Sequence, residues 1–182
     1  MKFITKIGQK VGDFMLKKEL KSLERSVVFN NFNSALTIGF IFNAMNKEYH
    51  SKAKDFINYV EDRGIKTFGI AYVEKSDLIG YLPYKKGVSY FGLDKKNWYG
   101  KPIDQGAEEF IKRPFDILID ISLSEIYQVK HIFALSKAKF KICNDSVKTK
   151  YADFVLKLDN KDKLELLIEQ IIHYLEIIET KK

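Results

Sequence analysis

Cysteine, histidine and proline are scarce in this sequence, whose 182 residues include 1 Cys, 3 His and 3 Pro. A single thiol excludes a disulfide framework and any zinc site built from several thiolates. His50, His131 and His173 form neither of the helical zinc-binding spacings, H-x-x-x-H and H-E-x-x-H. No catalytic triad is supported, so we expect no metal and no cofactor, and the sequence favours a protein that is not an enzyme.

Long uninterrupted hydrophobic segments are also missing. Lys6, Lys10 and Asp13 interrupt the apolar residues that follow the basic start, which argues against a signal peptide. The longest uncharged segment, Ser26–Asn46, reaches the length of a transmembrane helix but includes five asparagines, whose amides would be costly in lipid. We therefore expect a cytoplasmic protein without a membrane-spanning helix.

The sequence does contain apolar surface and positive charge. Hydrophobic residues make up 46% and aromatic residues 14%, which is enough to bury one core and excludes a disordered chain. The formal net charge is +7, of which the first 25 residues carry +4 and all the others +3. The positive charge is therefore concentrated near the N-terminal end.

Residues 2–24 show the periodicity of an amphipathic helix. Apolar residues share one stripe, with lysines on its flank: Phe3, Ile4, Ile7, Val11, Phe14 and Met15. Leu16, Leu20 and Leu23 fall on the opposite side. Either a second helix begins near Leu16, or one helix meets different partners along its length.

We divide the chain into a basic helical appendage, residues 1–28, and an α/β domain, residues 29–182. Gly8 and Gly12 each cost about 1 kcal/mol relative to alanine, so we expect the helix to need a surface on which to form. That surface is an anionic membrane interface, a groove of RNA or protein, the domain itself or a second copy of the chain.

Beyond residue 28, strand and helix signals alternate. Six segments have the apolar content of strands: residues 35–42, 65–73, 88–91, 115–121, 138–143 and 152–158. The first two flank a helix, and such a βαβ unit implies parallel strands with a right-handed crossover. We predict an α/β fold: a single Rossmann-like domain of three layers with a mostly parallel sheet of five or six strands, preceded by the basic amphipathic helix.

Individual residues mark the ends of these elements. Gly64 follows the helix after the first strand, where a residue in the left-handed region ends many helices. Asp104 is placed to cap a short helix, and Ser122 and Glu125 form a capping box for the helix after the fourth strand, residues 115–121. Asp116 lies at the entry of that strand, where we expect it near solvent.

Polar residues follow the predicted strands, at the edge where parallel sheets bind ligands. The candidates for a ligand pocket are Asn43, Asn46, Asp120, Ser122, Ser124 and Asn144. The first strand-to-helix turn has none of the glycines that let a backbone approach phosphates, which argues against a dinucleotide fingerprint and a P-loop. Loops are polar in any protein of this class, so the alternative is that Asp120 only bonds to a neighbouring loop.

The segment from Tyr84 to Lys101 interleaves basic and aromatic residues. Five lysines against Asp94 give it a net charge of +4, and five aromatic residues stand among them. Lysines that neutralise phosphates beside aromatics that stack on bases are what recognition of single-stranded RNA requires. The alternative is a lobe whose aromatics pack inward. With the N-terminal lysines, the candidates for contact with an anionic partner are Lys6, Lys10, Lys17, Lys85, Lys86, Lys95, Lys96, Trp98, Tyr99 and Lys101.

Three further segments carry a resemblance: residues 114–120 (PFDILID), 138–142 (AKFKI) and 173–178 (HYLEII). They resemble an uncharacterised family of short proteins from Bacteroidota, and the resemblance implies a basic N-terminal helix followed by one α/β domain, with no mechanism. That family usually has glycine where this sequence has Cys143. A weaker similarity, to the N-terminal half of glycosyltransferases of the heptosyltransferase type, lacks their second Rossmann half and implies only a similar fold.

These observations lead us to expect a non-enzymatic protein that binds a large anionic partner, with RNA or the ribosome as the first candidate. One alternative is an enzyme or sensor that binds a small molecule, such as a nucleotide sugar, at the strand ends. Another is peripheral attachment to a membrane through residues 1–25. A homo-oligomer formed through the N-terminal helix is a further possible partner arrangement.

Overall fold

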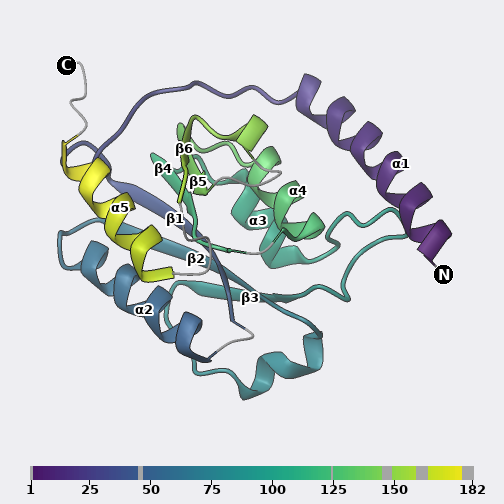
Figure 1. The fold of residues 1–182 in the computed structure, drawn as a ribbon, viewed down its shortest axis with the longest axis horizontal. Coiled ribbons are helices and arrows are strands. Elements are labelled where there is room, and N and C mark those ends of the chain that lie inside the picture. The colour runs from purple at the N-terminus through teal and green to yellow at the C-terminus, as the bar shows by residue number, and fades with distance from the viewer. Residues whose placement is uncertain (1, 45–46, 124, 145–148, 159–163, 178–182) are drawn as a thin grey trace.

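The computed structural model describes residues 2–44, 47–123, 125–144, 149–158 and 164–177, with side chains from Ile7 onward (Figure 1). A sheet of six parallel strands forms its centre. The strands are β1 (Thr37–Asn43), β2 (Lys66–Val73), β3 (Val88–Gly92), β4 (Ile117–Asp120), β5 (Phe140–Asn144) and β6 (Phe154–Leu156). The α/β class and the parallel sheet are confirmed.

Helices cover both faces of this sheet (Figure 1). The helices are α1 (Lys2–Lys21), α2 (Lys47–Glu61), α3 (Gln105–Lys112), α4 (Tyr127–Leu135) and α5 (Leu164–Ile177), with short 3₁₀ helices η1 (Ser76–Tyr81) and η2 (Thr149–Tyr151). Helices α2 and α5 pack on one face, and α3 and α4 on the other. Helix α1 is one continuous helix that packs on α4 from outside, so it adds a further layer.

The strand order is β3-β2-β1-β4-β5-β6, the order of the Rossmann fold. The order reverses between β1 and β4, where Ile41 lies beside Asp120. In such sheets the crevice beyond the strand ends at this reversal is the usual place for a ligand. The predicted candidate Asn43 is the last residue of β1, and Ser122 lies two residues beyond the end of β4.

The predicted element ends agree with the structure in two cases. Gly64 follows α2 with a φ of 78°, in the region that favours glycine. The Asp104 carboxylate accepts a hydrogen bond from the Ala107 amide at 3.0 Å and caps α3.

The capping box at Ser122 and Glu125 is wrong. Helix α4 begins one turn later, with Ile126 at its N-cap position and no side-chain cap. The Ser122 amide donates to the Asp120 carboxylate at 2.8 Å, and the Ser122 hydroxyl donates to the same oxygen. The Ser122 hydroxyl is therefore bonded to the Asp120 carboxylate and does not cap α4.

Asp116 is buried, so its expected place near solvent is wrong. Its carboxylate accepts hydrogen bonds at 2.9 Å from the amides of Leu36 and Thr37 and from Lys139 Nζ. Burial by itself would raise the pKa of Asp116, but Lys139 and the two amides outweigh it and lower the pKa. This carboxylate holds the chain that leads into β1.

No helix among the described residues is both long and apolar enough to cross a membrane.

Candidate functional site

Helix α1 docks on the protein through its two glycines. A Cβ atom on Gly8 would lie 2.9 Å from the Trp98 carbonyl oxygen, and one on Gly12 would lie 2.5 Å from the Tyr99 carbonyl oxygen. Leu16, the next residue on this side of the helix, is fully buried against the end of α4. Because a side chain at either glycine would collide with the backbone of residues 98–99, the glycines determine which side of α1 faces the body.

Polar contacts hold α1 in this orientation. Lys101 Nζ lies 2.8 Å from the Glu19 carboxylate, and Lys130 of α4 forms an ion pair with Asp13. Burial alone would raise the pKa of Asp13, but the neighbouring Lys130 outweighs this and lowers it. The Tyr127 hydroxyl donates to a backbone carbonyl of α1 at 3.0 Å. Helix α1 is therefore fixed by specific contacts as well as by close packing.

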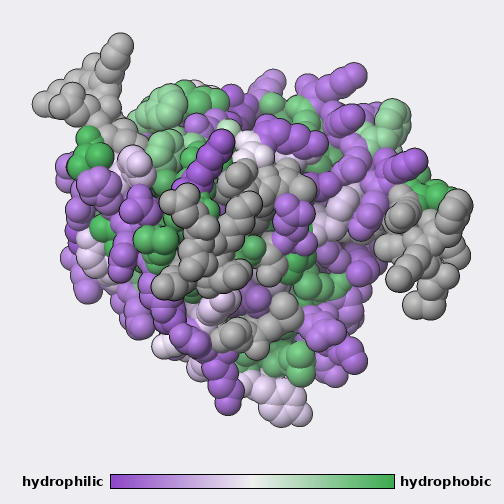
Figure 2. Space-filling view, in the orientation of Figure 1, coloured by the Kyte–Doolittle hydropathy of each residue, from purple (hydrophilic) through white to green (hydrophobic). Residues whose placement is uncertain are grey.

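The apolar stripe of α1 faces away from the body. Ile7 is 51% exposed and Phe14 is 68% exposed, while Val11 between them is half-buried. Lys10 and Lys17 are exposed on the same side. These five residues are called here the outward face of α1. Packing of the stripe on the domain, one of the alternatives from the sequence, is thus wrong for Ile7 and Phe14. Figure 2 shows hydrophobic and hydrophilic residues side by side along the edge that α1 forms.

The segment 84–101 is partly used inside the protein. Lys85 Nζ lies 3.0 Å from the Glu61 carboxylate, Lys101 is paired with α1 as described, and Phe91 is fully buried. The exposed members are Lys86, Lys95, Lys96, Tyr84 and Trp98. Because the Trp98 carbonyl packs against Gly8, the 72% exposed Trp98 belongs to the same side of the molecule as α1.

The strand-end candidates meet at one edge of the sheet, as parallel strands require. Asn43, Asp120 and Asn144 stand at the ends of β1, β4 and β5. Asp120 and Ser122 are fully buried and bonded to each other. Asn46 and Ser124 lie outside the described residues.

Tyr72 is a member of this strand-end cluster that the sequence did not suggest. It is fully buried on β2, on the same face of the sheet as Asp120. Burial, and then the charge of Asp120, raise its pKa, so its hydroxyl stays protonated. The strand-end cluster thus places the buried Tyr72 phenol near the buried carboxylate of Asp120, which is hydrogen-bonded to Ser122. Because Tyr72 occurs within an apolar strand segment, the sequence predicts only that its side chain packs in the core.

The sequence model of one family matches residues 9–178, nearly the whole chain. This chain belongs to DUF6913, a family of unknown function. The matched region of this DUF6913 chain includes Gly12 and Leu16, which dock α1, and Phe14 on its outward face. No curated protein matches the sequence. The origin in Bacteroidota stays a prediction.

Some predicted contacts of this DUF6913 chain lie where the structure describes no side chain. Lys6 and Phe3 belong to α1, but the side chains of residues 1–6 are outside the described part. Lys10 and Lys17 are exposed, and Tyr99 is half-buried. Among the predicted basic positions with described side chains, Lys10 and Lys17 on α1 are exposed, as are Lys86, Lys95 and Lys96.

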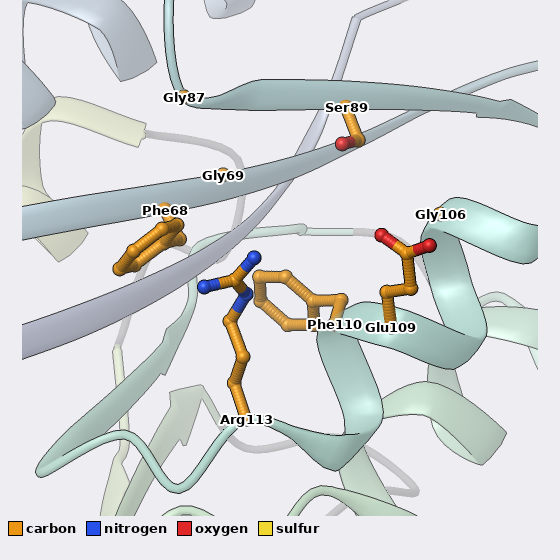
Figure 3. Close-up of a pocket in the computed structure, with 8 residues that line it drawn as sticks. All are labelled: Phe68, Gly69, Gly87, Ser89, Gly106, Glu109, Phe110 and Arg113. Carbon is orange, nitrogen blue, oxygen red and sulfur yellow. The ribbon is translucent and has the colours of Figure 1, made fainter.

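A small hollow lies between β2, β3 and α3 (Figure 3). The Arg113 guanidinium lies 4.2 Å from the centre of the Phe68 ring, and Figure 3 shows it between Phe68 and Phe110. Glu109 and Ser89 line the other end. The open space is about 40 Å³, little more than the volume of one water molecule in the liquid, so this hollow is too small for an organic ligand.

Within the described residues, no group of three or more His, Cys, Asp or Glu side chains is arranged to hold a metal ion.

Proposed function

We propose that this protein attaches to an anionic lipid surface through the outward face of α1. The supporting observation is the orientation of the helix: its glycines face the body, while Ile7 and Phe14 face solvent beside Lys10 and Lys17. A helix of this kind lies in a membrane interface, with apolar side chains among the acyl chains and lysines at the lipid headgroups.

The side chains of this face fit lipid better than the other partners considered. Burying an apolar side chain such as Phe14 in lipid contributes about 1.5–3 kcal/mol, and each lysine near an anionic surface contributes about 1 kcal/mol. RNA would neutralise the lysines but would leave the aliphatic Ile7 exposed. A second copy of α1 would place lysines against lysines. An anionic bilayer accommodates both kinds of residue.

Sedimentation with lipid vesicles tests the proposal. The full chain should sediment with vesicles of equal parts phosphatidylcholine and phosphatidylserine, and much less with phosphatidylcholine alone. Phe14→Ser should lower the partition coefficient about tenfold, because it removes about 1.5 kcal/mol of apolar transfer. Tyr84→Ser is the matched control, since Tyr84 is 82% exposed on another segment and should not contribute.

An RNA partner stays a prediction, and the same variants address it. Binding to single-stranded RNA at about 50 mM salt, lost steeply at higher salt and unchanged by Phe14→Ser, would favour RNA. Equal sedimentation of the wild-type protein and Phe14→Ser would contradict the lipid proposal. The strand-end cluster likewise stays a prediction of a small-molecule site, with Asp120→Ala as its test in a thermal-shift screen.

A further inference from the structure

A cavity lies under the C-terminal end of α1, away from the strand-end cluster. Its walls come from the end of α1 and the following chain, from Ala134 at the end of α4, and from the segment 150–153. The open space is about 270 Å³, close to the lower size of pockets that bind small organic ligands. Lys141 of β5 also lines this cavity.

Lys141 is an unusual residue to find there, because it is only 2% exposed. β5 is covered on both faces, so the alternation that places Phe140 and Ile142 on one side puts Lys141 inside on the other. Its Nζ donates to the Ala134 carbonyl at 2.9 Å. That is its one hydrogen bond to the described part of the chain, and an ammonium group has three N–H donors. The amine therefore has unused bonding capacity beside an open cavity.

The surroundings of Lys141 favour its neutral form. Burial, followed by the positive charge of Arg25, lowers the pKa of Lys141 to about 7, against a smaller opposing effect of Asp153. A lysine of this kind carries a lone pair on a substantial fraction of molecules near neutral pH, and a neutral amine is a nucleophile.

The charged residues of the cavity indicate which ligand it would take. Arg25 forms an ion pair with Asp153 and donates to the Lys139 carbonyl at 3.1 Å, so these two charges largely balance. Lys150 is exposed and also lines the cavity. The remaining charge at the opening is positive, and it would attract a carboxylate or phosphate group.

We propose that Lys141 is a covalent attachment site for a small aldehyde or ketone that carries an anionic group. The Lys141 nitrogen adds to the carbonyl carbon, a C=N bond replaces the C=O bond, and the carbonyl oxygen leaves as water with the two amine hydrogens. No oxidant or reductant takes part. When the imine is protonated, its N–H can still donate to the Ala134 carbonyl. The site is separate from the outward face of α1, so it does not rest on lipid binding.

Reductive trapping tests this site on the full chain. The protein is incubated near pH 7 with glyoxylate, an aldehyde with a carboxylate, and cyanoborohydride, and the modified lysines are mapped by mass spectrometry. Lys141 should be labelled at least about tenfold faster than the exposed Lys86 and Lys95, since an ordinary lysine of pKa about 10.4 is almost entirely protonated there. In urea this preference should disappear.

Two comparisons separate the amine from the anion-binding part of the proposal. Lys150→Gln should slow labelling of Lys141 by glyoxylate but not by propanal, which has no charge. Lys150 is exposed, so this variant is expected to fold. Labelling of Lys141 no faster than that of Lys86 would overturn the attachment site. If Lys150→Gln leaves the rate of Lys141 labelling by glyoxylate unchanged, as it should leave the rate with propanal, the anionic ligand class would be overturned.

Discussion

His131 is a buried histidine whose pKa depends strongly on its surroundings. Its side chain is fully buried on α4, and neither ring nitrogen has a hydrogen-bond partner within the described residues. The Tyr127 ring lies against it at 4.9 Å between ring centres. Burial, and then the charge of Lys130, lower the pKa of His131 to about 4. The folded protein therefore keeps this imidazole neutral.

His131 should make the protein less stable in mild acid. Its pKa is about 4 in the folded state against 6.5 for a free histidine side chain, so as pH falls through this window the unfolded chain takes up the proton first. At about pH 5 the free energy of unfolding should fall by about 2 kcal/mol relative to pH 7 on this account. Urea unfolding of His131→Leu should show a smaller fall, and His173→Leu, at an exposed position of α5, should behave like the wild-type protein. Identical pH dependence in all three proteins would contradict the prediction.

Asp116 should cause a second loss of stability in acid, at a lower pH than His131. Its pKa in the folded state is lowered, so its stabilising effect is present above the unfolded pKa and is lost as pH falls through the folded value. Asp116→Asn should reduce the free energy of unfolding at pH 7 by about 1–3 kcal/mol, because the amides of Leu36 and Thr37 lose a charged acceptor. Chemical denaturation at pH 7 measures this loss. An unchanged midpoint would show that Lys139 and the amides find other partners.

Among the elements, the strands were predictable and the orientation of α1 was not. The apolar run of β1 follows directly from burial in a covered sheet, whereas the alternation of β5 is typical of a half-covered strand, although β5 is buried along its whole length. For α1, periodicity correctly indicated one apolar stripe. It could not indicate which side docks, because Gly8 and Gly12 act through close approach to the backbone of residues 98–99, which lie far away in the sequence.

Gly12→Ala tests whether close approach holds α1 on the body. Alanine favours the helix by about 1 kcal/mol, but its Cβ would lie 2.2 Å from the Tyr127 hydroxyl oxygen and 2.5 Å from the Tyr99 carbonyl oxygen. We expect the amides of α1 to exchange with deuterium about tenfold faster, with little change in β1 or β4. Gly80→Ala is the control, since a Cβ there meets nothing within 4 Å. Slower exchange in α1 of Gly12→Ala would show that helix propensity dominates.

At the scale of the whole molecule, strand order depends on pairing between distant segments. Local patterns predicted each strand, but nothing local places β4 beside β1, because that pairing depends on which helices fit each face. The candidates Asn43, Asp120 and Asn144 could still be predicted to meet, since parallel strands end at one edge whatever their order. The sequence could not show that Tyr72 and Lys141 are buried polar residues. That became visible only once both faces of their strands were known to be covered.

The distribution of charge over the whole molecule leads to a final prediction about salt. Several basic residues of the body are neutralised by close partners, among them Lys85 by Glu61 and Lys130 by Asp13, whereas Lys10 and Lys17 on α1 are exposed. Salt should therefore weaken vesicle binding only in part, because it screens the lysines but does not oppose insertion of Phe14.

Between about 50 and 200 mM salt we expect the partition coefficient to fall roughly tenfold or less, whereas a contact carried by many phosphates would fall by about a thousandfold or more. Lys10→Gln combined with Lys17→Gln should flatten this dependence, and Phe14→Ser should keep its slope at a lower level of binding. If Phe14→Ser abolished the salt dependence of the partition coefficient, the lysines could not be its source, because they remain in that variant. That result would contradict the prediction.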